Sequence, residues 1–353
     1  MSEGTHASPP LLEVKDLVRH FPVRSSGVVR RTIGQVRAVD GVTFTVHEGS
    51  SLGLVGESGC GKSTTGRVIT RLLDPTSGSV TFDGRDIATL SQKQMRDVRR
   101  DIQIIFQDPY TSLNPRHTVG SIVGAPLEVH DIVPRNEVLT RVQELLERVG
   151  LNPEHYNRYP SEFSGGQRQR IGIARALALN PKLIVADEPV SALDVSIQAQ
   201  VINLMEELKR DLGIAFLFIA HDLAIVRHFC PEIAVMYLGK IVEIGPREWV
   251  YDQPHHPYTQ ALLSAVPDIK QAALGGRRGR IKLEGDVPSP INPPSGCRFR
   301  TRCWKAQDIC AQEEPPLLQI SPGHQAACHF AEPMDQALES AGALGTRGTI
   351  TSN

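Results

Sequence analysis

Residues 56–64 read Gly56-Glu57-Ser58-Gly59-Cys60-Gly61-Lys62-Ser63-Thr64, between an apolar run (52–55) and a segment typical of a helix (65–73). Glycine, four residues, glycine, lysine and serine form the pattern of a phosphate-binding loop. Its glycines allow a tight turn in which successive N–H groups point into one concavity at a helix N-terminus. We predict a triphosphate there, with Lys62 at the β- and γ-phosphates and the Ser63 hydroxyl on Mg²⁺. The alternative, a glycine-rich turn that matches by chance, is disfavoured by the flanking strand and helix.

Composition and length narrow the class of protein. The 353 residues allow one large core, or one core with a smaller appended unit. A formal net charge of -1 shows no global basic excess of the kind that nucleic-acid binding favours. The longest apolar run, Ile214 to Ala220, is far shorter than the roughly 20 residues of a membrane span. Met1 to Pro10 lacks the basic and apolar regions of a secretory signal. We therefore expect a cytosolic protein that reaches a membrane only through a partner.

Acidic side chains follow a second apolar run. Residues 183–186 are continuously apolar, which is typical of a parallel strand buried on both faces. Asp187 and Glu188 come next, at the strand end where open α/β sheets place their ligands. We predict that Asp187 is associated with Mg²⁺ and that Glu188 polarises the attacking water. His221 follows the apolar run at 214–220 and could contact the γ-phosphate from the same end. Two solvated acids and a structural histidine are the alternatives.

A second candidate anion site lies in the middle of the chain. Ser164-Gly165-Gly166-Gln167 leads into a helical segment, and Ser164 is suited to be its N-cap. A capped helix start with two glycines and a hydroxyl can bind an anion, whereas the plain alternative is a capping turn. Residues 108–179 are punctuated by proline and glycine and include the amphipathic segment Glu137 to Val149. This texture predicts a helical insertion between two halves that contain strands.

The N-terminal part predicts strands. We expect short strands over 11–14 and 42–46, an exposed loop over 25–35, and a hairpin in which Asp83-Gly84 follows a strand at 80–82. A second hairpin is predicted from 233–237 and 241–244. Phe21 could stack on an adenine, or it could be a core residue at the sheet edge.

Together these segments resemble the nucleotide-binding subunits of ABC transporters over about Leu11 to Gly245. The matching motifs are Gly56 to Ser63 (Walker A), Gln107 (Q-loop), Ser164 to Gln167 (signature motif, with Phe163 where leucine is usual), Leu183 to Glu188 (Walker B), Ser191 to Asp194 (D-loop) and His221 (switch histidine). Six motifs in the family's order are far more specific than a lone phosphate loop.

The resemblance implies an α/β fold: a P-loop NTPase (RecA-like) core with an antiparallel β-subdomain, an α-helical subdomain and a small C-terminal extension. It implies that two such domains pair head to tail around ATP. The implied ATP-binding residues are Gly56, Glu57, Ser58, Gly59, Cys60, Gly61, Lys62, Ser63, Thr64 and Phe21, with Ser164, Gly165, Gly166 and Gln167 contacting the ATP of the partner subunit. The implied catalytic residues are Glu188, His221 and Gln107; Ser63, Gln107 and Asp187 hold Mg²⁺, and Asp194 belongs to the D-loop.

The C-terminal part resembles a subtype. His255-His256-Pro257-Tyr258-Thr259, with residues 287–290 and 296–303, is similar to the C-terminal extension of oligopeptide and dipeptide importer ATPases. The N-terminal start looks like their F-type subunit. We expect a nucleotide-binding domain over 1–253, an extension over 254–330 and a flexible tail over 331–353.

The implied function is ATP-driven peptide import at the cytoplasmic face of the cell membrane. Implied partners are a second, different ATPase chain, two transmembrane permease subunits and an extracytoplasmic substrate-binding protein; nucleic acid is not expected. Another cargo (nickel, glutathione or an opine) is an alternative. A soluble ABC protein of DNA repair or translation is a second alternative, although those usually carry two nucleotide domains or a long coiled-coil insertion.

Four of the six cysteines lie in the last quarter of the chain. Cys297, Cys303, Cys310 and Cys328 are separated by 5, 6 and 17 residues, unlike the close pairs of structural zinc sites. Four thiolates can hold a [4Fe–4S] cluster, and the importer ATPases that this tail resembles include members with one. Four reduced thiols, or zinc with His324 or His329, are the alternatives. Arg298, Arg300 and Arg302 could offset the charge of a cluster or form a solvated face.

Overall fold

The computed structural model describes residues 9–25, 32–265 and 281–333. They form two compact units, each assembled from separate stretches of the chain. The first unit takes its described residues from 9–17, 43–53 and 63–221, and the second takes them from 18–42, 54–62 and 222 onward. The chain passes from the second unit to the first between Lys62 and Ser63.

A parallel sheet organises the first unit. Strands β8 (Ala215–Ala220), β7 (Leu183–Asp187) and β6 (Ile102–Ile105) are neighbours in that order, and the first residues of β3 (Ser51–Val55) lie beside β8. β7 pairs in parallel with both of its neighbours, with Val185 opposite Ile104 and Leu217. Every residue of β7 and β8 is buried, as the continuous apolar runs predict. Helix α1 (Lys62–Ile69) packs closely on this sheet, since a Cβ on Gly66 would lie 2.8 Å from Ile219.

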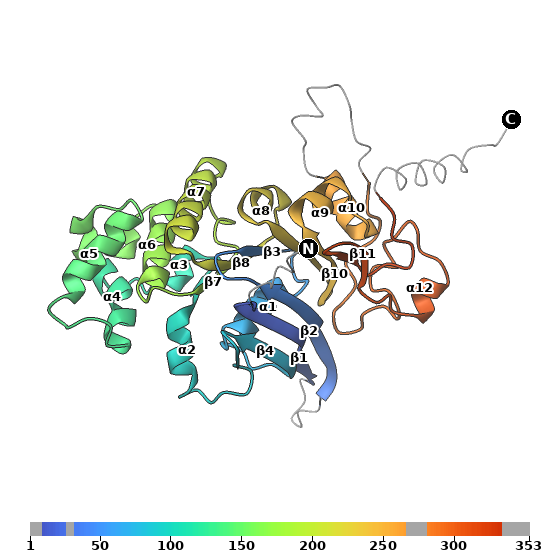
Figure 1. Ribbon diagram of the computed structural model, residues 1–353, viewed down its shortest axis with the longest axis horizontal. Helices are drawn as coiled ribbons and strands as arrows, with labels where there is room; N and C mark the ends of the chain where they lie inside the picture. Colours follow the sequence, from blue (N-terminus) through green and yellow to red (C-terminus); the bar gives the residue numbers. More distant parts are fainter. Residues whose placement is uncertain (1–8, 26–31, 266–280, 334–353) are drawn as a thin grey trace, which may run out of the picture. The chain divides into compact units, whose positions relative to one another are not determined.

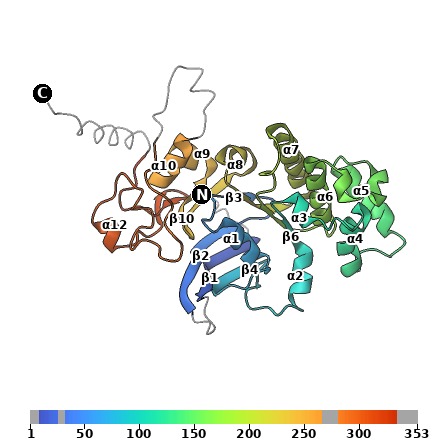
Figure 2. The same ribbon diagram turned by 180° about the vertical axis from the view of Figure 1, so that it is seen from behind.

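The predicted helical insertion is confirmed. It contains α3 (Pro109–Ser112), α4 (Val119–Val129), α5 (Val138–Arg148) and α6 (Gly165–Leu177), with single 3-10 turns at Pro153–Asn157 and Pro160–Glu162. Helices α4, α5 and α6 lie side by side in both views (Figures 1 and 2). The amphipathic segment predicted over Glu137 to Val149 is confirmed as α5, whose buried residues are Val138, Val142, Leu145 and Leu146, with Val149 buried at its C-cap. Helix α7 (Val195–Leu212) follows β7. Among the described residues, each helix is too short or too polar to cross a bilayer.

The antiparallel strands are longer than predicted. Strands β2 (Thr32–Val46), β1 (Leu12–Arg24), β4 (Ser77–Phe82) and β5 (Arg85–Asp86) are neighbours in that order. The predicted hairpin at Asp83-Gly84 is confirmed, because it joins β4 to β5. The expected short strands were wrong in length, and residues 32–35 of the expected loop belong to β2. Much of β2 is exposed on alternate residues, so a polar sequence is compatible with strand there. Helix α2 (Met95–Asp101) follows β5.

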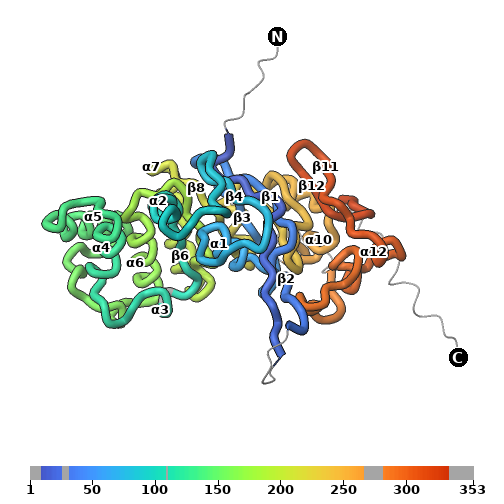
Figure 3. The backbone as a smooth tube through the Cα atoms, turned by 90° about the horizontal axis from the view of Figure 1, so that it is seen from below, coloured from blue at the N-terminus to red at the C-terminus, as the bar shows by residue number. Residues whose placement is uncertain are grey.

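The second unit contains an antiparallel sheet. Its strands run in the order β11 (Leu318–Ser321), β12 (His324–Ala326), β10 (Lys240–Pro246) and β9 (Glu232–Tyr237). The predicted β9–β10 hairpin is confirmed, whereas β11 and β12 were not predicted. Helices α8 (Leu223–Phe229), α9 (Arg247–Asp252), α10 (Pro257–Ser264) and α12 (Ile309–Gln312) belong to the same unit. Figure 3 shows β11, β12 and α12 in the red part of the tube.

Candidate functional site

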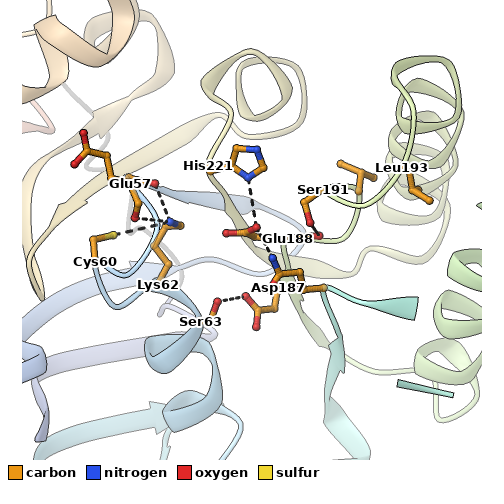
Figure 4. A network of polar contacts seen from close by, with 12 residues as sticks. Glu57, Cys60, Lys62, Ser63, Asp187, Glu188, Ser191, Leu193 and His221 are labelled. Carbon is orange, nitrogen blue, oxygen red and sulfur yellow. Dashed lines mark hydrogen bonds and ion pairs between the residues drawn. The ribbon is translucent and has the colours of Figure 1, made fainter. Parts of the chain in front are cut away.

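Asp187, the last residue of β7, is one of the predicted Mg²⁺ ligands in the first unit. Its side chain is almost fully buried, at 1% exposure. The Ser63 hydroxyl, from the first turn of α1, donates a hydrogen bond to Asp187 Oδ1 at 2.6 Å (Figure 4). A serine hydroxyl and a carboxylate oxygen are both ligands that Mg²⁺ accepts. The fold therefore brings together two of the three residues predicted to hold the metal ion.

Glu188 is the meeting point of the other predicted catalytic residues. Gln107 Nε2, two residues beyond β6, donates to Glu188 Oε2 at 2.8 Å. His221 Nδ1, directly after β8, lies 3.4 Å from the same oxygen (Figure 4). The Glu188 side chain is 11% exposed and that of His221 is 52% exposed. Three adjacent parallel strands thus end at one carboxylate, which a water molecule can still reach.

The backbone at Glu188 is unusual. Its φ of 47° lies in the left-handed region, which costs a residue other than glycine on the order of 1 kcal/mol. The Glu188 N–H donates to the Ile219 carbonyl at 2.9 Å, and the Ser191 hydroxyl donates to the Glu188 carbonyl at 3.1 Å. Hydrogen bonds on both sides hold this strained residue in place.

The predicted signature residues begin α6. Ser164 and Gln167 form a reciprocal capping box, as predicted for an N-cap: Ser164 Oγ accepts from the Gln167 N–H, and Gln167 Oε1 accepts from the Ser164 N–H. Gly166 must be a glycine, because a Cβ there would lie 2.4 Å from Ile197 of α7. Gly165 is the first residue of the helix. Asp194 caps α7 in turn, accepting from the Ile197 N–H.

The phosphate loop lies almost entirely in the second unit. Gly56 and Gly61 have φ values of 154° and 110°, and a Cβ on either would lie within 2.2 Å of a backbone carbonyl oxygen. Lys62 is buried, and its Nζ donates to the Gly56 carbonyl at 2.8 Å. It also donates to the Glu57 carbonyl at 3.0 Å (Figure 4). Of the remaining loop residues, Ser58 and Gly59 are exposed and Thr64 is half-buried.

Cys60 is a packed residue of the loop. It is buried, and its Sγ lies 3.9 Å from Lys62 Nζ. Burial raises the pKa of the Cys60 thiol, so the neutral form is favoured at physiological pH. A neutral buried thiol suits packing rather than nucleophilic chemistry.

Phe21 lies on β1 and is half-buried. The Arg19 guanidinium lies 4.6 Å from the centroid of its ring. A partly exposed aromatic face is compatible with stacking on a base. Its contact with adenine stays a prediction.

Sequence reasoning missed the contacts of the C-terminal part with the loop. The Glu57 N–H donates to the Tyr258 hydroxyl at 2.8 Å, and Arg302 holds both carboxylate oxygens of Glu57 at 2.7 and 3.1 Å. Arg298 pairs with Asp40 of β2. The interpretation of these arginines as a solvated face was wrong for Arg298 and Arg302, whose side chains are 7% and 8% exposed, because each has a carboxylate partner.

The four clustered cysteines line one pocket. Cys297, Cys303, Cys310 and Cys328 surround it together with His329, Lys305 and several other side chains. All four are free thiols. Burial raises the pKa of Cys303 to about 12 and that of Cys328 to about 11, which favours the thiol form. The pocket gathers four cysteines that are spread over 32 residues of sequence.

Another buried polar group was also missed. Glu243, His255 and His324 offer ligand atoms within 4.8 Å of one another. The Glu243 carboxylate accepts from the backbone N–H groups of His255 and His256 at 2.9 and 3.0 Å, and its Oε1 lies 2.8 Å from His324 Nε2. His324 therefore belongs to this group and is not among the residues that line the cysteine pocket. No periodic or spacing signal in the sequence predicts the group.

Comparison with known proteins identifies the family. The family described as "ABC transporter" matches residues 39–191, and that described as "Oligopeptide/dipeptide transporter, C-terminal region" matches residues 242–310. The oligopeptide transport ATP-binding protein AppF of Bacillus subtilis is 55% identical over 321 residues, which are 91% of this chain and 97% of that protein. The chain belongs to the oligopeptide-transport group of ABC ATP-binding proteins.

Further relatives agree with this membership. The probable peptide ABC transporter ATP-binding protein y4tS of Sinorhizobium fredii is 51% identical over 341 residues, 96% of this chain and 95% of that one. The solved structure of cbiO1 from Clostridium perfringens, part of the ABC transporter complex cbiONQ, has a TM-score of 0.59 at 29% identity and covers 69% of this chain and 91% of that one. The ATP-binding cassette MJ0796, a dimer bound to ADP and Pi, has a TM-score of 0.57 at 29% identity and covers 67% of this chain and 98% of that one.

These relatives confirm the expected fold, a P-loop NTPase of the ABC type. The chain is an ATP-binding subunit whose ATPase activity is coupled to transport.

Proposed function

We propose that this ATPase energises the uptake of dipeptides or oligopeptides across the cytoplasmic membrane. The observation that carries the proposal is that relatives named for oligopeptide or peptide transport match over at least nine-tenths of the chain, including its C-terminal extension. On this basis we also infer the expected partition: a nucleotide-binding domain over 1–253, the extension over 254–330 and a tail beyond it.

Within the nucleotide site, we propose that one ATP is bound by residues 56–64 together with the Asp187–Glu188 group. Lys62 and Ser63 are adjacent in the chain, so a phosphate at one and a metal ion at the other would be neighbours. Mg²⁺ would be held by Ser63, Asp187 and Gln107, and would supply charge neutralisation at the phosphates. Glu188 would accept a proton from the attacking water, and His221 would contact the γ-phosphate.

A second ATPase subunit completes the site in this proposal. Ser164 and the glycines after it begin a helix, where N–H groups and the positive end of the helix dipole favour an anion. The related MJ0796 cassette is a dimer in its solved structure. We propose that Ser164, Gly165, Gly166 and Gln167 bind the γ-phosphate held by the partner's loop. The partner is a different ATPase chain, and this one is the F-type subunit.

Permease subunits would dock on the helical insertion. A surface pocket there is lined by residues of β6, α4 and α6, among them Gln103, Ser121, Ile122 and Arg175. Gln103 lies four residues before Gln107, which contacts Glu188. A movement of the permease would therefore be transmitted to the Glu188 carboxylate through residues 103–107. The complex would include two permeases at the cytoplasmic face and an extracytoplasmic binding protein.

We also propose that the cysteine pocket holds a [4Fe–4S] cluster. The support is that all four cysteines line it, which matches the ligand set of such clusters. A single zinc ion is less favoured, because structural zinc sites usually have close cysteine pairs, whereas these four cysteines are separated by 5, 6 and 17 residues. The positive charge of bound iron would favour the thiolate form and so oppose the effect of burial, which raises the pKa of the thiols. Iron and acid-labile sulfide assays on anaerobically purified protein should find about four of each per chain, and four reduced thiols with neither would refute the proposal.

Uptake measured in proteoliposomes tests the proposed function. The chain is reconstituted with its permeases, its partner ATPase and the binding protein, and accumulation of a labelled oligopeptide is followed with ATP on the ATPase side. We expect accumulation that depends on ATP and is lost with Lys62→Ala. Accumulation of nickel, glutathione or an opine, with none of peptide, would reject the proposed cargo.

A further inference from the structure

We propose that Tyr258 and Arg302 are positioning residues of the nucleotide site, because they hold Glu57 of the phosphate loop and thereby set the affinity of the loop for ATP. The proposal rests on the proposed function of residues 56–64 as the triphosphate site. Tyr258 and Arg302 lie 201 and 245 residues from Glu57 in sequence. All three belong to the second unit.

Tyr258 acts on the backbone of the loop. Its hydroxyl accepts the Glu57 N–H at 2.8 Å, so this N–H is already satisfied and is not offered to a phosphate. The Tyr258 ring is fully buried, with Tyr237 and Phe299 at centroid distances of 4.7 and 5.4 Å. Burial raises the pKa of Tyr258, so the hydroxyl stays protonated. A rigid aromatic cluster thus fixes the position of the hydrogen-bond acceptor.

Arg302 acts on the side chain of the same residue. Its two terminal nitrogens lie 2.7 and 3.1 Å from the two carboxylate oxygens of Glu57, a bidentate arrangement that lysine cannot reproduce. The Arg302 side chain is 8% exposed and that of Glu57 is 26% exposed. The hydrogen bonds that Arg302 donates to the Glu57 carboxylate raise the pKa of Arg302, so the guanidinium remains charged. Glu57 is therefore held at its N–H and at its carboxylate.

The Glu57 carbonyl connects these contacts with Lys62, the residue proposed to bind the phosphates. It accepts from Lys62 Nζ at 3.0 Å and from the Cys60 N–H at 3.3 Å. A loop held in its binding shape loses less conformational entropy when the ligand arrives. Loss of the contact of either Tyr258 or Arg302 with Glu57 should therefore weaken ATP binding. The turnover step should change little, because Tyr258 and Arg302 contact Glu57 of the loop, whereas the proposed general base is Glu188, which contacts Gln107 and His221.

Steady-state ATPase kinetics and equilibrium binding of Mg-ATP to the full-length protein, in its transporter complex, test the proposal. Arg302→Met should raise KM and Kd for ATP about 3- to 10-fold, with kcat within about 2-fold of wild type. Arg302→Lys should recover only part of this loss, and Tyr258→Phe should raise KM about 3-fold. Arg247→Met is the matched control, because Arg247, in the same unit, pairs with Glu248 of α9 and belongs to no proposed site.

A double-mutant cycle separates positioning from a general loss of folding. In the Glu57→Gln background, Arg302→Met should add little, since the carboxylate it holds is gone. The inference is overturned if Arg302→Met and Tyr258→Phe both keep the wild-type KM, or if the effects of Glu57→Gln and Arg302→Met multiply. The Lys62→Ala variant distinguishes a failure of the positioning role from a failure of the proposed function of the loop. If Lys62→Ala also keeps normal ATP affinity, the proposed function of the loop fails; if it alone loses ATP, only the positioning role fails.

Discussion

Glu188 is the residue on which the proposed chemistry depends. It combines a left-handed backbone, a nearly buried side chain and contacts with Gln107 and His221. Strain of this kind persists only where the surrounding structure holds it, and it is concentrated at functional sites. The sequence predicts the type of residue and its place at the end of a strand, but not its backbone conformation.

Replacing Glu188 by Gln should slow ATP hydrolysis by the transporter complex by about 10²- to 10⁴-fold, because an amide cannot accept the proton of the attacking water. ATP affinity should stay close to wild type, since the phosphate loop is intact. Single-turnover hydrolysis and equilibrium ATP binding measure the two effects. Glu207→Gln, at an exposed position of α7, is the matched control. Near-normal hydrolysis by Glu188→Gln would remove Glu188 from the role of general base.

Helix α10 shows what an element adds to a motif. The sequence singles out His256 only as part of a family motif, whereas in the structure it is the N-cap of α10. Its Nδ1 accepts the Tyr258 N–H at 3.0 Å, a role that requires the neutral ring. Burial lowers the pKa of His256 to about 4, with Lys305 acting in the same direction and Glu243 opposing it.

This depressed pKa predicts a loss of stability in acid. Between the ordinary histidine pKa of 6.5 and about 4, the unfolded chain binds a proton that the folded chain does not, so stability falls as the pH falls through this window. His256 should contribute a loss of about 2 kcal/mol between pH 7 and pH 5. The pKa of His255 is also lowered by burial, and it acts in the same direction.

Chemical denaturation of the full-length protein at pH 7 and pH 5 measures the effect. His256→Asn keeps a side-chain oxygen at the N-cap and removes the titrating ring, so its stability should fall less between the two pH values. His228→Asn, at an exposed position of α8, should behave like wild type. The assignment fails if His256→Asn loses as much stability in acid as wild type does.

Across the whole molecule, the sequence predicts those helices and strands whose formation depends on residues close together in the chain. Continuous apolar runs predict β7 and β8, the apolar stripe predicts α5, and the capping residues predict the start of α6. Contacts between distant residues leave no such pattern. Arg302 pairs with Glu57, and Glu243 pairs with His324, only because the fold brings these distant residues together. Strands β11 and β12 were missed for the same reason, since β12 pairs with β10 and β11 pairs with β12, and their short sequences do not indicate these pairings.

The central claim is that ATP is hydrolysed between the phosphate loop of one subunit and the Ser164 helix of its neighbour. Ser164→Ala also removes an N-cap, so Thr118→Ala, which removes the N-cap of α4, is the matched control for lost helix stability. The deciding measurement is the ATP hydrolysis rate of the assembled complex with the signature serine replaced in every copy. We predict that the rate falls at least about 10-fold, while Thr118→Ala keeps the wild-type rate. An unchanged rate in the serine variant would contradict the shared site.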